Sequence, residues 1–499
     1  MTVALFVVCA ILTASVAAAA EAPELLAGVA KIDITDRRAG PVNDPLYVKA
    51  LVLQQGDTRA AIITVDAVAI GEIGPIGNGY LPAVRARLEK DLGIPPAHVL
   101  ANASHCHGIV CADVEQRTVQ AVQEAVKNLT PVRVGVGTGQ ENRIMINRRL
   151  KLKNGRELDV RHAYSLPPDD EIEAVGPVDS EIGLLRLDRE DGRTLAVVYN
   201  FACHPIQGVP SGGNTADITG FASRVIEGNL SEGAVALFLQ GCAGDVNPVT
   251  YKTFDVPRDA ESLGNLLGLS VLQATRQIRT TPEARFKLVQ KTIELPRADV
   301  AQRIIAMEAE QQRLAQSLGG TTLNLKTFVP LLIKYKLAPE FPASPAFEYL
   351  QEKARGRGDL ARLDSENRKN LEQYIANIQA MEQLTRLNTN LALLRKHQAD
   401  NVAAGRRTIA VEVLGLRVGE FVLVTFPGEL TVETGLAIKK ASPHPATFVA
   451  GYTNGYIYYA PTSEQLANVG GAQEDSDCIL APEWQRIYLE SVSGILKGL

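Results

Sequence analysis

The sequence is poor in several residue types that would point to particular functions. Its six cysteines include no Cys-x-x-Cys pair, and the five beyond residue 20 are odd in number. They do not suggest a disulfide framework, and we interpret them as buried free thiols. The chain has no sustained run of lysine or arginine and a formal net charge of −5, which argues against a nucleic-acid partner. Histidine is also scarce, with seven in 499 residues, whereas an apolar content of 46% is that of a globular chain.

The N-terminal segment predicts export. From Ala4 to Ala20 the chain is apolar or small, and a tract of four alanines precedes Glu21. This pattern resembles a secretory apolar region with its cleavage site, so we assign residues 1–20 to a signal peptide and expect a secreted or periplasmic protein. A retained anchor that leaves the protein membrane-associated, and a start codon further upstream, are the alternatives, because no basic residue precedes the apolar run.

Short apolar strands alternate with amphipathic helices over much of the chain. β-rich runs at 47–53 and 60–65 flank Gly56-Asp57, which is a hairpin signal. Helical spacing of apolar residues over 81–92 predicts a helix, and the apolar run at 99–101 predicts a buried strand. The predicted fold class is α/β (α+β), with layered mixed β-sheets and flanking helices that form one large domain.

Residues 299–405 differ in character from the rest of the chain. Apolar residues from Leu371 to Leu394 recur every three or four positions with few interruptions, which predicts a long helix. We therefore divide the chain after the signal peptide into a main domain in two parts, 21–298 and 406–499, and a helical insertion between them. A plain scaffold hairpin is the alternative for the insertion, and peripheral contact with a lipid surface is a further option for its amphipathic helix.

Side chains able to bind a metal or move a proton follow several of the predicted strands. His105 and His107 stand two positions apart after a buried strand, and His204 follows the apolar run 195–201 and precedes a proline. Glu429 stands at another strand exit, within Pro-Gly-Glu. Structural histidines that are hydrogen-bonded to neighbours are the alternative, but the recurrence of this placement favours a functional site.

Two further loops carry polar groups. The stretch from Gln240 to Pro248 leaves an apolar strand and contains two glycines, which is typical of a tight loop whose backbone N–H groups face a ligand. An ordinary turn with Asp245 as a cap is the alternative. Residues 452–459 hold four tyrosines in a Gly/Asn turn, where we expect at least one hydroxyl to be used.

Five of these stretches, in this order, resemble motifs of the neutral/alkaline ceramidase family. They are Ser104-His-Cys-His-Gly108, Phe201-Ala-Cys-His-Pro205, Gln240-Gly-Cys-Ala-Gly-Asp-Val-Asn-Pro248, Pro427-Gly-Glu429 and Gly451-Tyr-Thr-Asn-Gly-Tyr-Ile-Tyr-Tyr459. The similarity extends from Gly28 to Gly471, and five ordered matches are much more specific than any one of them.

The resemblance implies a zinc-dependent amidase. The implied metal ligands are His105, His204, Glu429 and Tyr459, with Tyr458 as the rival to Tyr459 because the matching loop is short. Two imidazoles and a carboxylate leave a coordination position for water, as catalytic zinc requires.

The resemblance also implies roles in the reaction. His107 matches a family histidine that exchanges a proton with the attacking water or the leaving amine, and Arg148 matches an arginine that faces the substrate. The implied reaction is hydrolysis of the N-acyl amide of ceramide, or of a ceramide-like lipid, to a fatty acid and a sphingoid base by a zinc-activated water. The partner would be this lipid or another small amide, and the oligomeric state is left open.

Three departures from the family bear on the substrate. Asn247 stands where ceramidases carry a serine, and asparagine can donate a hydrogen bond to an oxyanion but cannot act as a nucleophile. The stretch 470–474 has no tyrosine where the family carries one, and the sequence stops at Leu499, without the C-terminal immunoglobulin-like domain of longer ceramidases. We therefore expect a diverged member that keeps the metal set. A hydrolase of a different amide or ester, and an inactive binding or cell-surface protein, are the alternatives.

Overall fold

The computed structural model describes most of the chain. The described residues are 23–160, 166–251, 253, 255–282, 284–468 and 471–499. The predicted signal peptide lies outside them, so export stays a prediction. All five described cysteines are buried free thiols, as expected from their odd number and spacing.

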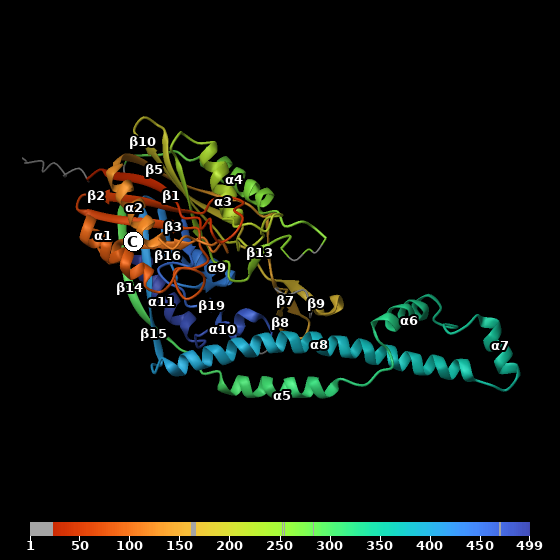
Figure 1. Cartoon of the computed structure of the whole chain (residues 1–499). Helices are drawn as coiled ribbons and strands as arrows, with labels where there is room; N and C mark the ends of the chain where they lie inside the picture. The colour runs from red at the N-terminus through yellow and green to blue at the C-terminus, as the bar shows by residue number, and fades with distance from the viewer. Residues whose placement is uncertain (1–22, 161–165, 252, 254, 283, 469–470) are drawn as a thin grey trace, which may run out of the picture.

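A mixed eight-stranded sheet forms the centre of the molecule (Figure 1). Its strands in spatial order are β12 (Val235–Gln240), β11 (Thr194–Phe201), β10 (Glu181–Arg189), β5 (Thr130–Gln140), β1 (Leu25–Asp33), β2 (Tyr47–Gln55), β3 (Thr58–Val65) and β4 (Val99–Ala103). The pairs β3–β4 and β11–β12 are parallel, and the other neighbours are antiparallel. The predicted hairpin at Gly56-Asp57 joins β2 to β3, with Gly56 in the left-handed region at φ +56°.

A second sheet packs against the first. It consists of β14 (Phe286–Pro296), β15 (Thr408–Val418), β16 (Phe421–Thr425) and β18 (Thr447–Ala450). Alternate residues of both sheets meet in one buried apolar cluster, which includes Leu51, Leu185 and Leu237 of the first sheet and Leu416 and Phe448 of the second. This interface is one of four large buried apolar clusters in the body, and the other three lie mainly between the sheets and their helices.

Helices cover the two outer faces. α1 (Tyr80–Leu92), α2 (Val114–Lys127), α3 (Asp217–Gly228) and α4 (Ala260–Thr275) lie on the larger sheet, whereas α9 (Val432–Ala441) and α11 (Trp484–Gly498) lie on the smaller one. The result is a layered mixed α/β architecture, which confirms the predicted fold class.

The connections contain shorter elements. These are η1 (Pro96–His98), β6 (Met145–Asn147), β7 (Arg149–Leu152), β8 (Glu157–Asp159), η2 (Asp169–Glu171), β9 (Ile172–Val175), β13 (Val246–Pro248), β17 (Glu429–Leu430), β19 (Tyr459–Ala460), α10 (Ser463–Leu466) and η3 (Gln473–Asp475). Three small sheets form from them, namely β6 with β13, β17 with β19, and β7 with β8 and β9.

Residues 301–403 form a helical arm. It contains α5 (Ala301–Ser317), α6 (Leu325–Leu337), α7 (Ala346–Ala354) and α8 (Asp359–Ala403). The predicted apolar stripe lies on α8, where Leu387, Leu391 and Leu394 pack against Met307 and Leu314 of α5. At 1.5 Å per residue, the 45 residues of α8 extend over about 68 Å.

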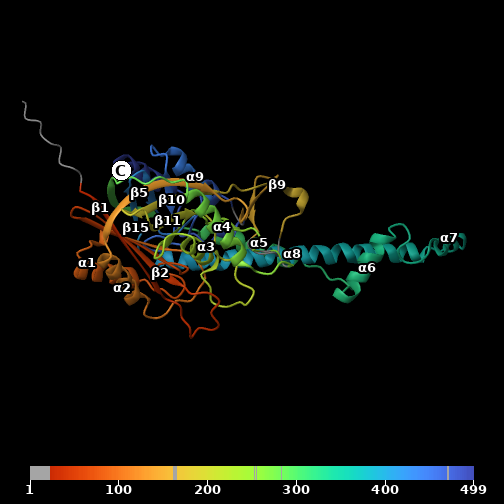
Figure 2. The same cartoon turned by 90° about the horizontal axis from the view of Figure 1, so that it is seen from above.

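The arm runs along the body at one end and projects far beyond it at the other (Figure 2). α6 and α7 lie at the projecting end. Within the part of the chain that the structure describes, no helix combines the length and apolar character that a membrane crossing requires. The division of the chain into a two-part main domain and an insertion stays a prediction.

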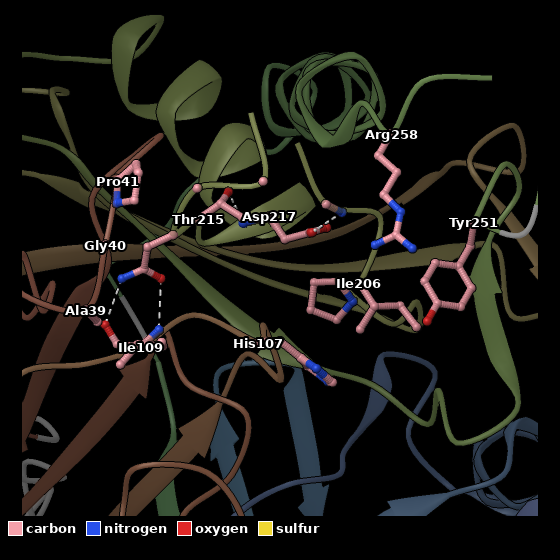
Figure 3. Close-up of a pocket in the computed structure, with 15 residues that line it drawn as sticks. Ala39, Gly40, Pro41, His107, Ile109, Ile206, Thr215, Asp217, Tyr251 and Arg258 are labelled. Atoms are coloured by element: carbon pink, nitrogen blue, oxygen red, sulfur yellow. Dashed lines mark hydrogen bonds between the residues drawn. The ribbon is translucent and has the colours of Figure 1, made fainter. Parts of the chain in front are cut away.

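Loops that follow the strands enclose a pocket of about 330 Å³ (Figure 3). His107 and Pro205, each close to one of the predicted metal ligands, line it together with Tyr251 and Arg258. The ends of β4 and β11 therefore lie next to this pocket.

Candidate metal centre

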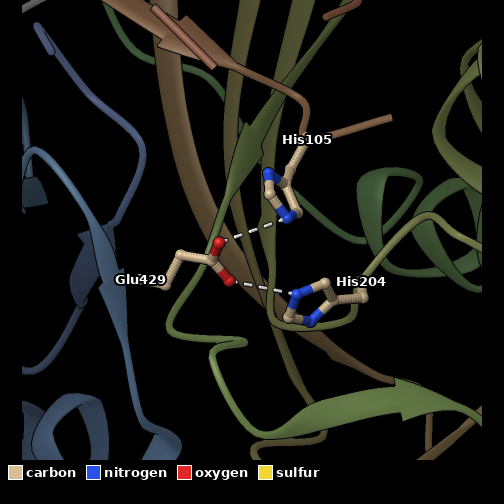
Figure 4. A group of neighbouring side chains, drawn as sticks. All are labelled: His105, His204 and Glu429. Atoms are coloured by element: carbon tan, nitrogen blue, oxygen red, sulfur yellow. Dashed lines mark hydrogen bonds and ion pairs between the residues drawn. The ribbon is translucent and has the colours of Figure 1, made fainter. Parts of the chain in front are cut away.

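Two histidines and one glutamate converge at the ends of three strands (Figure 4). Nε2 of His204 lies 3.1 Å from one carboxylate oxygen of Glu429, and Nε2 of His105 lies 3.5 Å from the other. All three residues are buried, and their ligand atoms lie within 4.8 Å of one another. The three strand exits that the sequence singled out thus meet in one site.

Backbone carbonyls orient both imidazoles. Nδ1 of His105 is 2.6 Å from the carbonyl oxygen of Val68, and Nδ1 of His204 is 3.1 Å from that of Val246. Because a carbonyl oxygen only accepts, we assign the proton to each Nδ1, which leaves a lone pair on each Nε2. A backbone carbonyl that accepts from the ring nitrogen opposite the binding nitrogen is typical of histidines that bind a metal.

The backbone at His105 is held in an unusual conformation. Its φ is +68°, in the left-handed region that residues other than glycine rarely adopt. Its N–H donates to the carbonyl of Ala67 at 2.9 Å, and the preceding Ser104 donates to Val65. The left-handed turn after β4 directs the imidazole of His105 toward Glu429, and such strain is typical of functional sites.

Two tyrosines hold the Glu429 carboxylate. The hydroxyl of Tyr452 donates to one oxygen at 3.0 Å, and the hydroxyl of Tyr456 donates to the other. Burial raises the pKa of Glu429, but the two imidazoles and the hydrogen bond from Tyr456 outweigh burial and hold that pKa well below its usual range. The carboxylate is therefore ionised at neutral pH.

The donor set fits a metal cation. Burial lowers the pKa of His105 to about 4, despite the attraction of Glu429, so its ring is neutral at pH 7. A neutral Nε2 lone pair and an ionised carboxylate are both hydrogen-bond acceptors, so they repel each other at short distance. A cation bound between them would remove this repulsion. Nitrogen and oxygen ligands in this number suit zinc with at least one position left for water.

Asn102 ties the strand ends together. Its amide nitrogen donates to the carbonyl of Gly451 at 2.8 Å and to the hydroxyl of Thr453 at 2.9 Å. Its amide oxygen accepts from the backbone N–H of Gln240 at 3.0 Å. One side chain thus connects the ends of β4, β12 and β18, although these strands are far apart in sequence.

Tyr458 and Tyr459 point in different directions. Tyr459 pairs with Glu429 in the parallel β17–β19 bridge, which places their side chains on the same side, and its hydroxyl accepts from Nη2 of Arg148 at 3.3 Å. The hydroxyl of Tyr458 instead accepts from Lys396 of the arm at 2.9 Å. All four tyrosines of 452–459 therefore use their hydroxyls, and of the neighbours Tyr458 and Tyr459 it is Tyr459 that lies on the Glu429 side.

Arg148 lies buried beside this group. Its guanidinium donates to Oδ1 of Asn247 at 3.0 Å, and its Nε lies 2.6 Å from Oε1 of Glu474. Burial lowers the pKa of Arg148, but Glu474, followed by Tyr459, outweighs burial and holds that pKa above its usual range. Arg148 and Asn247, predicted from separate motifs, are thus brought into direct contact.

His107 is close to the buried group of His105, His204 and Glu429 but is not buried with it. Its ring centroid is 5.7 Å from that of His105, at an interplanar angle of 87°. Its side chain is exposed and lines the pocket, with Tyr251 and Arg258 around the same hollow (Figure 3). A ligand in this pocket would therefore reach an imidazole that adjoins the group of His105, His204 and Glu429.

The glycine-containing loop serves a structural purpose. Oδ1 of Asp245 accepts from the backbone N–H of Val432 at the start of α9, so this carboxylate fixes the loop to a helix that is distant in sequence. The N–H of Gly244 donates to the carbonyl of Leu430, and a Cβ on Gly244 would come within 2.8 Å of the Glu429 carbonyl oxygen. Glycine here lets the loop approach β17 closely.

Neither Asn102 nor Glu474 was predicted from the sequence as a contributor to the site. Asn102 stands three residues before His105, but nothing in the sequence indicated its bridging role. Glu474 lies in the stretch 470–474, which has no tyrosine. Its pairing with Arg148 depends on a tertiary contact between residues more than 300 positions apart. Its place in an acidic run, Glu474-Asp475, was the available signal.

Comparison with known proteins shows a fold relationship. No known protein-family profile matches the chain, and no curated protein sequence matches it significantly. A neutral ceramidase from Pseudomonas aeruginosa is similar in structure, with a TM-score of 0.58 and 15% identity over 96% of this chain and 75% of that chain. A ceramidase complexed with C2 is similar too, with a TM-score of 0.59 and 15% identity over 95% of this chain and 75% of that one. The chain thus has a ceramidase-like fold.

Proposed function

We propose that this protein is a zinc-dependent amidohydrolase of the neutral ceramidase family, which cleaves the N-acyl amide of ceramide or of a ceramide-like lipid. The observation that carries the proposal is the convergence of the two carbonyl-oriented imidazoles of His105 and His204 on the Glu429 carboxylate. The ceramidase-like fold supports the choice of substrate class. In this proposal residues 1–20 export the protein, so that it acts outside the cytoplasm.

His105, His204, Glu429 and Tyr459 would hold the metal. When bound, zinc supplies a Lewis acid for the amide carbonyl and lowers the pKa of water. The chain's own contribution is to fix the ligand geometry, because the Val68 carbonyl orients one imidazole and the tyrosine hydroxyls fix both oxygens of the carboxylate.

Arg148 and Asn247 would stabilise negative charge as the amide is attacked. The amide oxygen of Asn247 already accepts from Arg148, so its Nδ2 group is the end that donates to an oxyanion. Arg148 also donates to the hydroxyl of Tyr459 at 3.3 Å, which holds the guanidinium beside this phenol. Asn247 is compatible with this hydrolysis because no step requires a hydroxyl nucleophile at that position.

His107 would transfer the proton. The attacking water must lose a proton and the leaving amine must gain one, and the exposed imidazole in the pocket next to His105 supports this role for His107. Arg258 and Tyr251 line the same pocket, where the substrate would enter.

The proposal is tested with purified protein loaded with zinc and a short-chain ceramide. We expect mass spectrometry to detect free fatty acid and sphingosine, and a chelator to abolish their release. Zinc-loaded protein that releases neither product refutes ceramide as the substrate, and a panel of other acyl amides and esters then identifies the bond that is cleaved.

A matched pair of variants tests the metal centre. His204→Ala is expected to lose both bound zinc, measured by elemental mass spectrometry, and activity. His98→Ala, at a half-buried histidine in η1, serves as the control and is expected to keep both. Zinc retained by His204→Ala at the wild-type level would refute the ligand assignment.

A further inference from the structure

The projecting end of the arm exposes an apolar helix face. On α6, Leu325, Val329, Leu332, Ile333 and Leu337 are all exposed, and Leu337 reaches 81%. Their spacing of three, four and eight residues places them on one side of the helix. The opposite side is the one that packs against α8, so these apolar side chains face away from the arm.

The next helix along the chain, α7, also exposes apolar side chains. Phe347 and Leu350 on α7 are each 65% exposed and stand three residues apart, on one face of their helix. α6 and α7 lie at the same distal end of the arm in both views (Figures 1 and 2). Two exposed apolar helix faces at one end of the arm are unusual on a protein surface that contacts only water.

Basic residues accompany the apolar ones. α6 carries three lysines and no acidic residue, and residues 325–369 hold nine basic and six acidic residues. The whole chain has a net charge of −5, so the arm tip, which we define as residues 325–369, is a cationic region on an acidic protein. Lys326 and Lys336 lie on or beside the apolar face, where their long side chains can place the ammonium groups at a headgroup level.

We propose that the arm tip docks on an anionic lipid bilayer, with α6 lying in the interfacial plane. An amphipathic helix with an apolar face and lysines at its margins is suited to this position, and the positive charge complements anionic headgroups. The described helices include no membrane-spanning candidate, so the contact is peripheral. The proposal goes beyond the hydrolase function and does not depend on it.

The base of the arm is fixed to the body next to the metal centre. His397 on α8 pairs with Asp477 at 2.7 Å, and Arg386 pairs with Asp159. Arg303 on α5 donates to the carbonyl of Asp475 at 3.1 Å. Docking of the tip would therefore hold the body, and its pocket, at a set position relative to the bilayer.

Vesicle co-sedimentation of the full chain tests the apolar contribution. We expect binding to vesicles of phosphatidylcholine mixed with phosphatidylglycerol, and a loss of roughly tenfold or more in the double variant Leu332→Asp/Leu337→Asp. The matched control, Leu269→Asp/Val402→Asp, changes two exposed apolar residues outside the tip and is expected to bind as the wild type does. All four positions are exposed, so circular dichroism should show that each variant folds.

A second pair of variants tests the charge. Lys326→Gln/Lys336→Gln is expected to weaken binding by about fivefold for each lysine, and added salt should have a similar effect. Lys90→Gln/Lys440→Gln, which removes two exposed lysines of the body, is the control and is expected to leave binding unchanged.

Three results would overturn the proposal. The first is equal binding to vesicles with and without the anionic lipid. The second is vesicle binding that the tip variants do not change. The third is the absence of vesicle binding together with a dimer, detected by light scattering, that Leu332→Asp/Leu337→Asp dissociates, since this would assign the face to a second copy of the chain.

Discussion

The buried ion pair between Arg148 and Glu474 makes the stability of the protein sensitive to one substitution. Nε of Arg148 lies 2.6 Å from Oε1 of Glu474, and the two side chains are 1% and 0% exposed. Glu474→Gln keeps the size of the side chain and removes its charge. We expect the variant to fold with a markedly lower free energy of unfolding.

The magnitude follows from the burial of Arg148. Breaking a buried pair by removing one partner leaves an uncompensated charge and costs about 3–5 kcal/mol. The carbonyl of Gly244 and the amide of Asn247 still accept from the guanidinium, and they place the expected loss near the lower end of that range. Removing both charges, in Arg148→Met/Glu474→Gln, should cost less than the sum of the single variants.

Urea denaturation followed by circular dichroism measures this loss, with a chelator present so that metal release does not contribute. Glu490→Gln, in an exposed ion pair with Arg486, is the control and is expected to have no measurable effect. A free energy of unfolding for Glu474→Gln within about 1 kcal/mol of the wild type would refute the reasoning, because a buried guanidinium that loses its carboxylate partner should destabilise the fold by more than that.

Three further predictions concern the site. Tyr456→Phe removes a hydrogen bond to Glu429 and should weaken zinc affinity roughly 10–100-fold in competition with a chromogenic chelator; unchanged affinity would contradict an orienting role. Tyr459→Phe should lower zinc affinity and activity whereas Tyr458→Phe should not, and the reverse result would exchange their assignments. Burial raises the pKa of Asp217 to about 6 in the folded protein, so its ionisation opposes folding. Protonated Asp217 therefore contributes at most about 3 kcal/mol to the free energy of unfolding, and this contribution should be lost as pH rises from about 4 to 6. Asp217→Asn should abolish that part of the pH dependence.

Local patterns in the sequence were enough to find the strand exits. An apolar strand that ends in a polar residue, as before His105, His204 and Glu429, is visible within ten residues because side-chain alternation and chain breakers are local properties. The long helix of the arm was visible for the same reason, since Leu371 to Leu394 keep helical spacing within one segment. The exposed face of α6 was not recognised, because spacing alone does not say which apolar face lacks a partner.

The sequence by itself determined the chemistry that is present: the ligand types, their placement after strands, and the resemblance that joined five motifs. Tertiary structure alone decided the pairings. Tyr459 rather than Tyr458 lies on the Glu429 side because of the β17–β19 register, and Glu474 meets Arg148 across more than 300 residues. Such contacts depend on how distant segments pack, and the free energy of that packing is shared by the whole core, so no short stretch of sequence records it.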